Sequence, residues 1–165
     1  MKKVVLIIAL AIMAIGVNAK DLKGTRGFVD LGYGIGIDGS AESNITLLGS
    51  YGWQVAEPLF AGVGIGFNYY HDFGDGHLAM PIFGHVRYDL KTSSKYSPFA
   101  DVKLGYSPKI NEIKGLYFSP GFGCRLNLGR LAFNVGLYYV LQKIEVTGMD
   151  SGNADNIAIR LGLEF

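Results

Sequence analysis

Four side chains able to bind a metal ion lie within seven residues of one another in the first half of the chain. They are His71, Asp72, Asp75 and His77. Imidazole and carboxylate donors at this density suit zinc or manganese. The segment also contains two glycines and reads as the polar loop of a hairpin. We therefore expect a solvated loop here and leave metal binding open as the alternative.

Catalysis would need a nucleophile beside a base. Lipid hydrolases and acyltransferases that are membrane barrels place a histidine, a serine and an acid near the outer rim. The candidates in this chain are His71 with Ser107 or Ser40, and none forms a close His-x-Ser pair. The sequence therefore predicts that the protein is not an enzyme and needs no cofactor.

The segment around residue 36 matches the dinucleotide-binding fingerprint, with Gly34, Gly36 and Gly39 at the required spacing. That motif functions only where a helix follows and presents its amide groups to a pyrophosphate. Another alternating segment follows here instead. We interpret these glycines as small residues of a strand and a loop.

The elements that position these residues are strands. In the last ten residues, hydrophobic side chains occupy every second position: Ile157, Ile159, Leu161, Leu163 and Phe165. A period of two is the period of a β-strand. The same alternation predicts strands over 28–37, 44–55, 59–70, 79–90, 98–106, 116–128, 131–142 and 156–165. No helical period occurs between them.

Charge is confined to one phase of these strands. The hydrophobic phase contains no Lys, Arg, Asp or Glu, whereas the other phase is rich in glycine and carries all the charge. A water-soluble barrel would place dense charge on its outer phase. A thin, glycine-rich polar phase instead suits the filling of a narrow barrel whose hydrophobic phase faces lipid. The sequence predicts an all-β protein, an eight-stranded antiparallel up-and-down transmembrane β-barrel.

Charged residues of the polar phase should therefore form a cluster in the lumen. This predicted cluster comprises Asp30, Arg87, Asp101, Lys103, Arg125, Arg160 and Glu164. Pairing about a turn near Ser94 places Arg87 opposite Asp101 and His85 opposite Lys103. Because eight strands enclose a space that side chains just fill, the lumen should be closed. The glycines of the first and third strands should leave room for Phe83, Phe99 and Tyr138.

Two further details follow from the pattern. Pro120 lies in the middle of a strand and removes one ladder bond, so we expect a bulge there. Short turns at 56–58, 91–97 and 128–130 alternate with four longer polar loops, one of them spanning 108–115. In barrels of this class the short turns face the periplasm. Aromatic residues should form girdles near both rims: Trp53, Tyr88, Phe133 and Phe165 at one, Tyr69, Tyr106, Phe118 and Tyr139 at the other.

Residues 1–19 resemble a secretory signal peptide, with Lys2 and Lys3, a hydrophobic run and small residues before a cut after Ala19. The remaining residues, 20–165, form one domain. The formal net charge of +1 argues against nucleic acid as a partner, and the single cysteine, Cys124, excludes an intramolecular disulfide.

The signal peptide, the eight alternating segments and the terminal Leu-Gly-Leu-Glu-Phe resemble small bacterial outer-membrane proteins of the OmpA/OmpX-like β-barrel family. This resemblance implies a location in the bacterial outer membrane, surrounded by its lipid. It also implies that Leu161, Leu163 and Phe165 form the C-terminal signal recognised by the barrel-assembly machinery during insertion.

Such barrels differ in function, so the resemblance leaves alternatives. We expect a non-enzymatic barrel with a structural or surface-interaction role and a lumen closed by side chains. A membrane-embedded enzyme that modifies lipid or lipopolysaccharide is one alternative. A soluble lipocalin-like carrier with a hydrophobic cavity is another.

Overall fold

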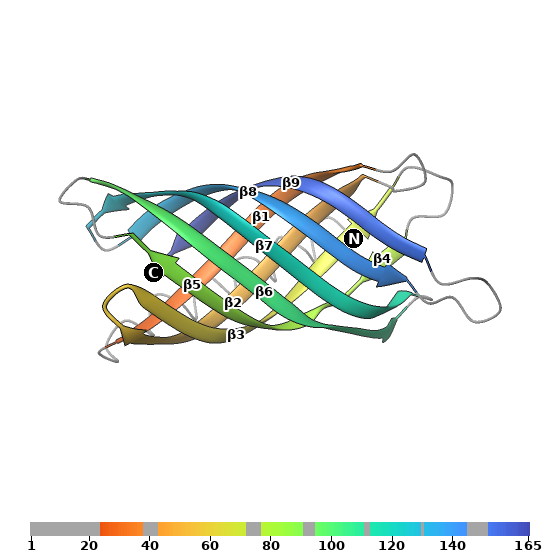
Figure 1. Cartoon of the computed structure of the whole chain (residues 1–165), viewed down its shortest axis with the longest axis horizontal. Helices are drawn as coiled ribbons and strands as arrows, with labels where there is room; N and C mark the ends of the chain where they lie inside the picture. Colours follow the sequence, from red (N-terminus) through yellow and green to blue (C-terminus); the bar gives the residue numbers. More distant parts are fainter. Residues whose placement is uncertain are drawn as a thin grey trace, which may run out of the picture.

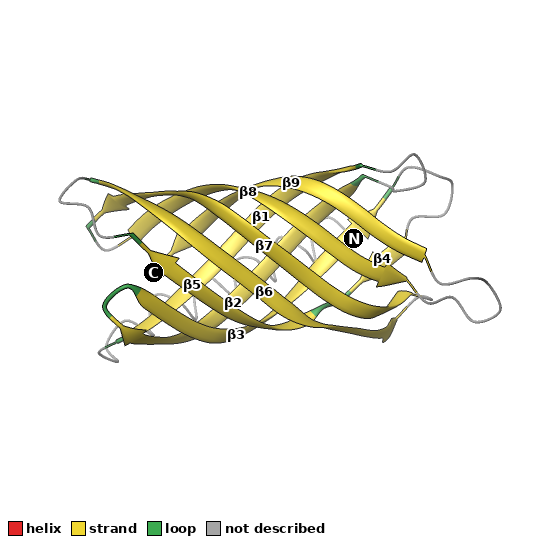
Figure 2. Ribbon diagram, in the orientation of Figure 1, coloured by secondary structure: helices red, strands yellow, loops and turns green. Residues whose placement is uncertain are grey.

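The protein is a closed antiparallel β-barrel in a computed structural model, which describes residues 24–37, 43–71, 77–90, 95–110, 113–129, 131–144 and 152–165. Strands cross the whole length of the molecule at a common tilt (Figure 1), and every described element is a strand, a turn or a loop (Figure 2). None of the described residues forms a helix long and hydrophobic enough to cross a membrane. The strands are β1 (Thr25–Gly36), β2 (Asn44–Ala56), β3 (Leu59–Tyr70), β4 (His77–Ala79), β5 (Ile82–Asp89), β6 (Tyr96–Ile110), β7 (Ile113–Leu128), β8 (Leu131–Ile144) and β9 (Gly152–Glu164).

The first and last strands close the ring. Strand β1 pairs with β2 on one side and with β9 on the other. The later strands pair with their sequence neighbours, except that β4 and β5 both pair with β3 and not with each other. Backbone bonds between Gly27 and Phe165, 2.9 and 3.1 Å long, continue the β1–β9 ladder to the last residue. The beginning of β1 and the end of the chain therefore lie at the same end of the barrel. The predicted all-β, up-and-down, eight-stranded architecture is confirmed.

The predicted strand over 79–90 is divided in two, which was not expected. Pro81 separates β4 from β5, because proline has no N–H to donate to the ladder. The register is unchanged across the gap: Asn68 pairs with Ala79, and Ile65 pairs with Ile82. The Gly66 N–H donates to the Pro81 carbonyl at 2.9 Å, so the two pieces act as one of the eight strands of the wall.

The bulge predicted at Pro120 is wrong. Between β7 and β8, Phe118 pairs with Leu141 and Gly121 pairs with Tyr138, which is the same register on both sides of Pro120. Toward β6, Pro120 stays in register opposite Val102. The ladder tolerates the missing N–H of this proline without inserting a residue.

The predicted loop over 108–115 is also wrong, because β6 and β7 continue to Ile110 and Ile113. The register shifts between Ser107 and Ile110, so the ladder is irregular there. Gly115 adopts a φ of +146°, where a side chain would be strained, and this lets the chain bend without leaving the ladder.

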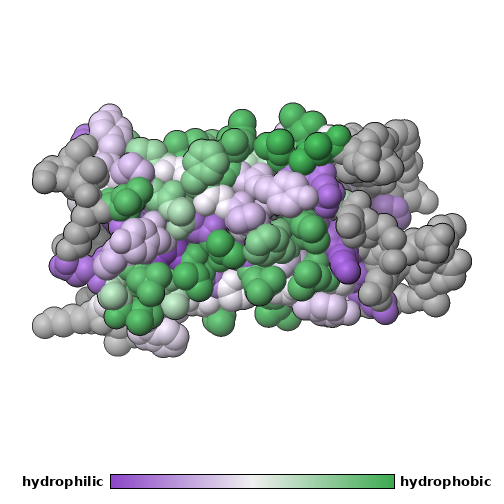
Figure 3. Space-filling view, in the orientation of Figure 1, coloured by the Kyte–Doolittle hydropathy of each residue, from purple (hydrophilic) through white to green (hydrophobic). Residues whose placement is uncertain are grey.

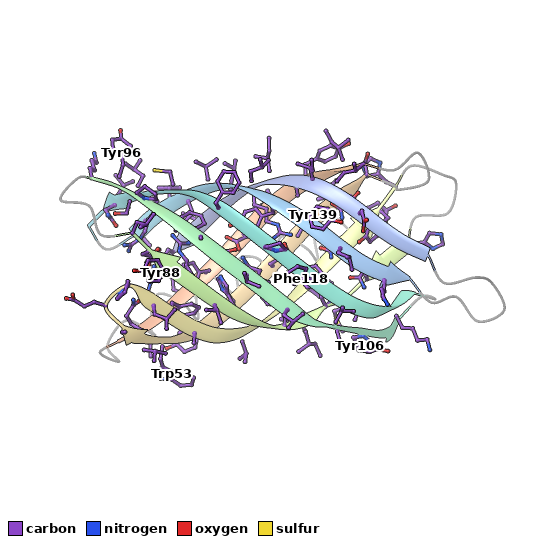
Figure 4. All side chains as sticks on the ribbon, in the orientation of Figure 1. Trp53, Tyr88, Tyr96, Tyr106, Phe118 and Tyr139 are labelled. Atoms are coloured by element: carbon purple, nitrogen blue, oxygen red, sulfur yellow. The ribbon has the colours of Figure 1, made fainter. Side chains whose placement is uncertain are left out.

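The outer wall is hydrophobic, as the alternation predicts. Side chains of the hydrophobic phase are exposed along all the long strands, and hydrophobic residues extend over the wall in view (Figure 3). Trp53, Tyr88 and Tyr96 lie toward the end that carries the C-terminus, and Tyr106 lies toward the opposite end (Figure 4). Phe118 and Tyr139 lie in that second half but further from its rim. Large hydrophobic side chains of the described strands therefore cover the wall between the two ends.

Arginine substitutions on β8 test whether this wall faces hydrocarbon. Val135 is 48% exposed and Leu131 is 46% exposed, both on the outer phase, but Leu131 begins the strand at the turn. Val135→Arg should lower the unfolding free energy by about 2–4 kcal/mol in liposomes, and Leu131→Arg by about 0–1 kcal/mol, because the cost of a charge depends on depth. Denaturant titration measures both. Equal costs at the two sites would contradict a lipid-facing wall.

Candidate functional site

The lumen gathers many of the charged side chains of the described strands. All seven members of the predicted cluster lie on the inward phase, and six of them are at most 6% exposed. Arg125 is the exception, with a side chain that is 25% exposed near the rim. Charges removed from water must be paired to be tolerated, so their partners determine what this lumen can do.

One ion-pair group fills the middle of the barrel around Lys103. Its Nζ lies 3.2 Å from Asp101 Oδ2 and 3.4 Å from Asp30 Oδ2. The Tyr138 hydroxyl donates to the same Asp101 oxygen at 3.1 Å. The Lys103 side chain is fully buried and the two carboxylates are nearly so. One cation therefore joins strands β1 and β6 across the interior.

A second ion-pair group lies at the end that carries the C-terminus. Arg26 bridges Asp89 at 2.6 Å and Glu164 at 2.9 Å, and Arg125 also reaches Glu164 at 2.6 Å. Arg26 further donates to Gln54 at 2.6 Å. This group ties the two ends of the described chain to the middle strands and covers the lumen at that rim.

The residue opposite Arg87 in the ladder is not the residue with which its side chain forms an ion pair. The ladder places Arg87 opposite Asp101 and His85 opposite Lys103, as predicted. The Arg87 guanidinium nevertheless pairs with Asp89 at 2.7 Å, donates to Asn134 at 2.8 Å and stacks 3.6 Å from the centre of the Phe99 ring. A long side chain reaches along its own strand and across the lumen, so the opposite position does not fix its partner.

Arg160 departs from the predicted charge pairing. It is 1% exposed, and no described carboxylate lies within ion-pair distance of it. One guanidinium nitrogen donates to the Tyr117 hydroxyl at 3.1 Å, and the group lies 4.3 Å from the centre of the Tyr138 ring. Asp30 and Asp101, the carboxylates that attract it from further away, already bind Lys103.

Sequence reasoning missed Arg26, which the structure places at the centre of the rim group. The first strand was predicted to begin at residue 28, whereas β1 begins at Thr25. The alternation extends two residues earlier, since Arg26 shares the inward phase of Phe28 and Asp30. Continuing the period-two alternation toward the N-terminus of β1 would have identified Arg26 as an inward-facing residue.

A serine, a histidine and an aspartate also meet in the lumen. Ser50 Oγ lies 2.8 Å from His85 Nδ1, and His85 Nε2 lies 3.4 Å from Asp101 Oδ2. The imidazole is 1% exposed and packs edge-on against Phe28 and Phe60. Asp101 simultaneously binds Lys103 and Tyr138. The three residue types are those of a catalytic triad, but the serine and the acid contact the opposite ring nitrogens from those used in a triad. The serine is also buried, and aromatic rings pack against the histidine.

His71 and Ser107, two of the catalytic candidates named from sequence, lie in different surroundings. Ser107 is fully buried and donates to Gln142 Oε1 at 3.1 Å, whereas His71 is exposed at the end of β3. Ser40, Asp72 and Asp75 lie outside the described residues, so the metal-binding alternative at His71 to His77 remains a prediction. Within the described ranges no group of three or more potential metal ligands occurs.

The dinucleotide-like glycines belong to the barrel wall. Gly34 and Gly36 lie in β1, paired with β9, and Gly39 lies outside the described residues. A helix that would bind a pyrophosphate does not follow them, since the next described element is β2.

Glycines make space for the aromatic rings that fill the lumen. The prediction placed these glycines on the first and third strands, but some of them lie on β7. A Cβ at Gly123 would lie 2.6 Å from Phe99 Cζ, and one at Gly121 would lie 2.5 Å from Tyr138 Cε1. Both of these glycines are in β7. Phe83 does lie over the third strand, where a Cβ at Gly64 would stand 2.6 Å from its Cζ. Each of these aromatic rings therefore packs in the space left by a glycine of the wall.

The residues of the predicted insertion signal end the closing strand. Leu161 is exposed on the outer wall at 62%, and the ring of Phe165 lies over Gly27 of β1. Their recognition during insertion remains a prediction, as does the signal peptide, which lies outside the described residues.

A closed eight-stranded barrel with a hydrophobic exterior and a polar interior is the architecture of small outer-membrane β-barrel proteins. Solved structures of that class share the fold of this chain. Neisserial surface protein A is similar with a TM-score of 0.57 and 14% identity, over 85% of this chain and 94% of that one. The outer membrane enzyme PagL is similar with a TM-score of 0.54 and 16% identity, over 84% and 98%.

A de novo designed transmembrane β-barrel is similar as well, with a TM-score of 0.53 and 18% identity over 86% of this chain and 93% of that one. A scan of protein-family models and a search of curated proteins both returned no match. At these identities the likeness concerns the fold alone. A surface protein, an enzyme and a design share it, so function has to be argued from the lumen and the surface of this chain.

The middle ion-pair group can be tested by removing its cation. Lys103→Met should lower the unfolding free energy by about 3–5 kcal/mol, because Asp30 and Asp101 would lose their buried partner. Adding Asp30→Asn should recover part of that loss. The exposed Lys143 provides a control, since Lys143→Met should change stability by no more than about 0.5 kcal/mol. Urea titration in liposomes measures all three, and equal effects of the two lysine substitutions would show that Lys103 is not a buried partner.

Proposed function

We propose that this protein is a non-enzymatic integral β-barrel of the bacterial outer membrane with a structural or surface-interaction role and a lumen closed by side chains. The observation that carries the proposal is the pairing of the lumen charges in two groups, one around Lys103 and one around Arg26. Arg26, Arg87, Lys103 and Arg125 are each bound to a buried or half-buried carboxylate. Side chains engaged with one another in this way provide structural support.

The hydrophobic exterior supports the location. The outer wall exposes large aliphatic and aromatic side chains on all the long strands, and a soluble protein rarely exposes so large a continuous hydrophobic surface. Closure of the ring pairs each long strand on both sides, which is what hydrocarbon requires. Among the described strands only the short β4 pairs on one side, with β3. Outer-membrane lipid is then the partner of the wall, and the barrel-assembly machinery is the partner of the closing strand during insertion.

The soluble-carrier alternative is disfavoured by the direction of the side chains. A carrier would bury the hydrophobic phase around its ligand, whereas here Leu31, Ile159 and Leu161 of that phase are 57–62% exposed. The inward phase consists of charges, amides, hydroxyls, glycines and rings in mutual contact.

The enzyme alternative rests on Ser50, His85 and Asp101. A reactive serine needs room for a substrate beside its oxygen and a histidine free to carry a proton. Ser50 is only 8% exposed, and His85 is held between Phe28 and Phe60 beside the Lys103 ion pairs. These contacts favour a structural hydrogen bond.

A serine-directed fluorophosphonate probe distinguishes the two roles. The refolded wild-type protein should remain unlabelled in detergent and in lipid, and Ser50→Ala should leave the lipid composition of cells unchanged. Ser50→Ala should cost about 0.5–1.5 kcal/mol of stability through the lost hydrogen bond. Labelling of the wild type that disappears in Ser50→Ala would establish an enzyme and refute the proposal.

A further inference from the structure

The ladder between β1 and β9 differs from the other ladders of the described barrel in how far apart its strands lie in the sequence. The other paired strands follow one another closely along the chain, whereas β1 and β9 are the first and the last described strands. Bringing such distant segments together costs more loop-closure entropy than forming a hairpin. We call the β1–β9 ladder the seam, and we expect it to open more readily than the hairpin ladders.

An aromatic ring lies across the seam at the end that carries the C-terminus. Gly27 and Phe165 exchange two backbone bonds, and the Phe165 ring lies over Gly27. A Cβ at Gly27 would stand 2.6 Å from Phe165 Cζ and 3.0 Å from Cδ2. Gly27 is buried, although Leu31 on the same outward phase of β1 is 57% exposed. The ring therefore occupies the place of the side chain that glycine lacks.

Other outward-facing glycines are not covered in this way. A Cβ at Gly49 of β2 would approach nothing closer than a backbone oxygen at 4.0 Å, and one at Gly84 of β5 would approach nothing closer than a backbone oxygen at 3.8 Å. Both are ordinary contact distances, so a side chain would fit at either position. The close fit of ring and glycine is specific to the seam among these outward positions.

An ion pair holds the inner face of the seam at the same level. Arg26 of β1 and Glu164 of β9 precede Gly27 and Phe165 along their strands, and their side chains lie 2.9 Å apart. Side chains of adjacent residues in a strand point to opposite faces. The seam is therefore held at this end by a ring on its outer face and by an ion pair on its inner face.

From this geometry we infer that the Phe165 ring is a latch on the seam, and that Gly27 is the socket in which it sits. The ring fits only where a side chain is missing, so its seating fixes the register of β9 against β1. Seating also sets how often the seam opens, because β9 cannot leave β1 without lifting the ring off Gly27. The latch is a property of the closed barrel and does not depend on the proposed surface role.

Hydrogen exchange of the refolded protein in detergent tests the latch. Gly27→Ala places a methyl group where the ring lies and displaces the ring. Amide exchange in β1 and β9 should become about three- to tenfold faster, the range expected for losing one aromatic contact, while exchange in β6 and β7 stays unchanged. Gly49→Ala is the matched control, since it adds a methyl group to an outward glycine with room for it, and it should change neither rate.

Phe165→Ala tests the same contact from the other strand. It should accelerate exchange in β1 and β9 as Gly27→Ala does, and adding Gly27→Ala to it should have no further effect, because no ring is left to displace. Refolding in detergent needs no assembly machinery, so a lost insertion signal cannot produce these results. Unchanged seam exchange in either single variant, equal acceleration in all strands, or additive effects in the double variant would each overturn the inference.

Discussion

Hydrogen bonds between β1 and β9 close the barrel, and this closure governs how the interior is packed. It pairs Phe28 to Gly36 with Asn156 to Glu164 and extends through Gly27 to the terminal Phe165. Once the ring is closed, the period of two sends each side chain to a fixed face. Hydrophobic side chains then face outward. Charged side chains that point inward have to pair within a lumen that side chains just fill. Two arrangements let the inward side chains fit in this narrow space. Lys103 and Arg26 form ion pairs, and aromatic rings pack over Gly121 and Gly123.

Much of this could be predicted from the sequence because period-two alternation is a local property. The strand phases, the register of Arg87 with Asp101 and the inward position of all seven charged residues followed from spacing and one turn centre. Strand ends and interruptions were harder to predict, because they depend on single hydrogen bonds. Proline and glycine both indicate a break or a turn in the sequence, but the outcome differs from site to site. Pro81 divides a strand, whereas Pro120 leaves the register unchanged. At Gly115 the chain bends while β6 and β7 continue as strands.

Partner choice in the lumen could not be predicted from register. Arginine and lysine side chains reach several residues along and across the barrel, so Arg87 pairs with Asp89, and Glu164 is shared by Arg26 and Arg125. Arg160 binds Tyr117 and stacks on Tyr138, although it lies on the same strand as Glu164. The contact of Ser50 with His85 joins β2 to β5, two strands that are not ladder neighbours, and no local pattern reports it. Three-dimensional packing across the interior decided these contacts.

A lumen closed along its length by packed and paired side chains, as we propose, lets no ions pass. Planar-bilayer recording of the pure, refolded protein tests this closure, because ions cross only if a continuous water path exists. We expect traces indistinguishable from those of protein-free detergent at every protein concentration. Reproducible single-channel steps whose frequency rises with protein concentration would contradict a closed lumen and indicate a small porin.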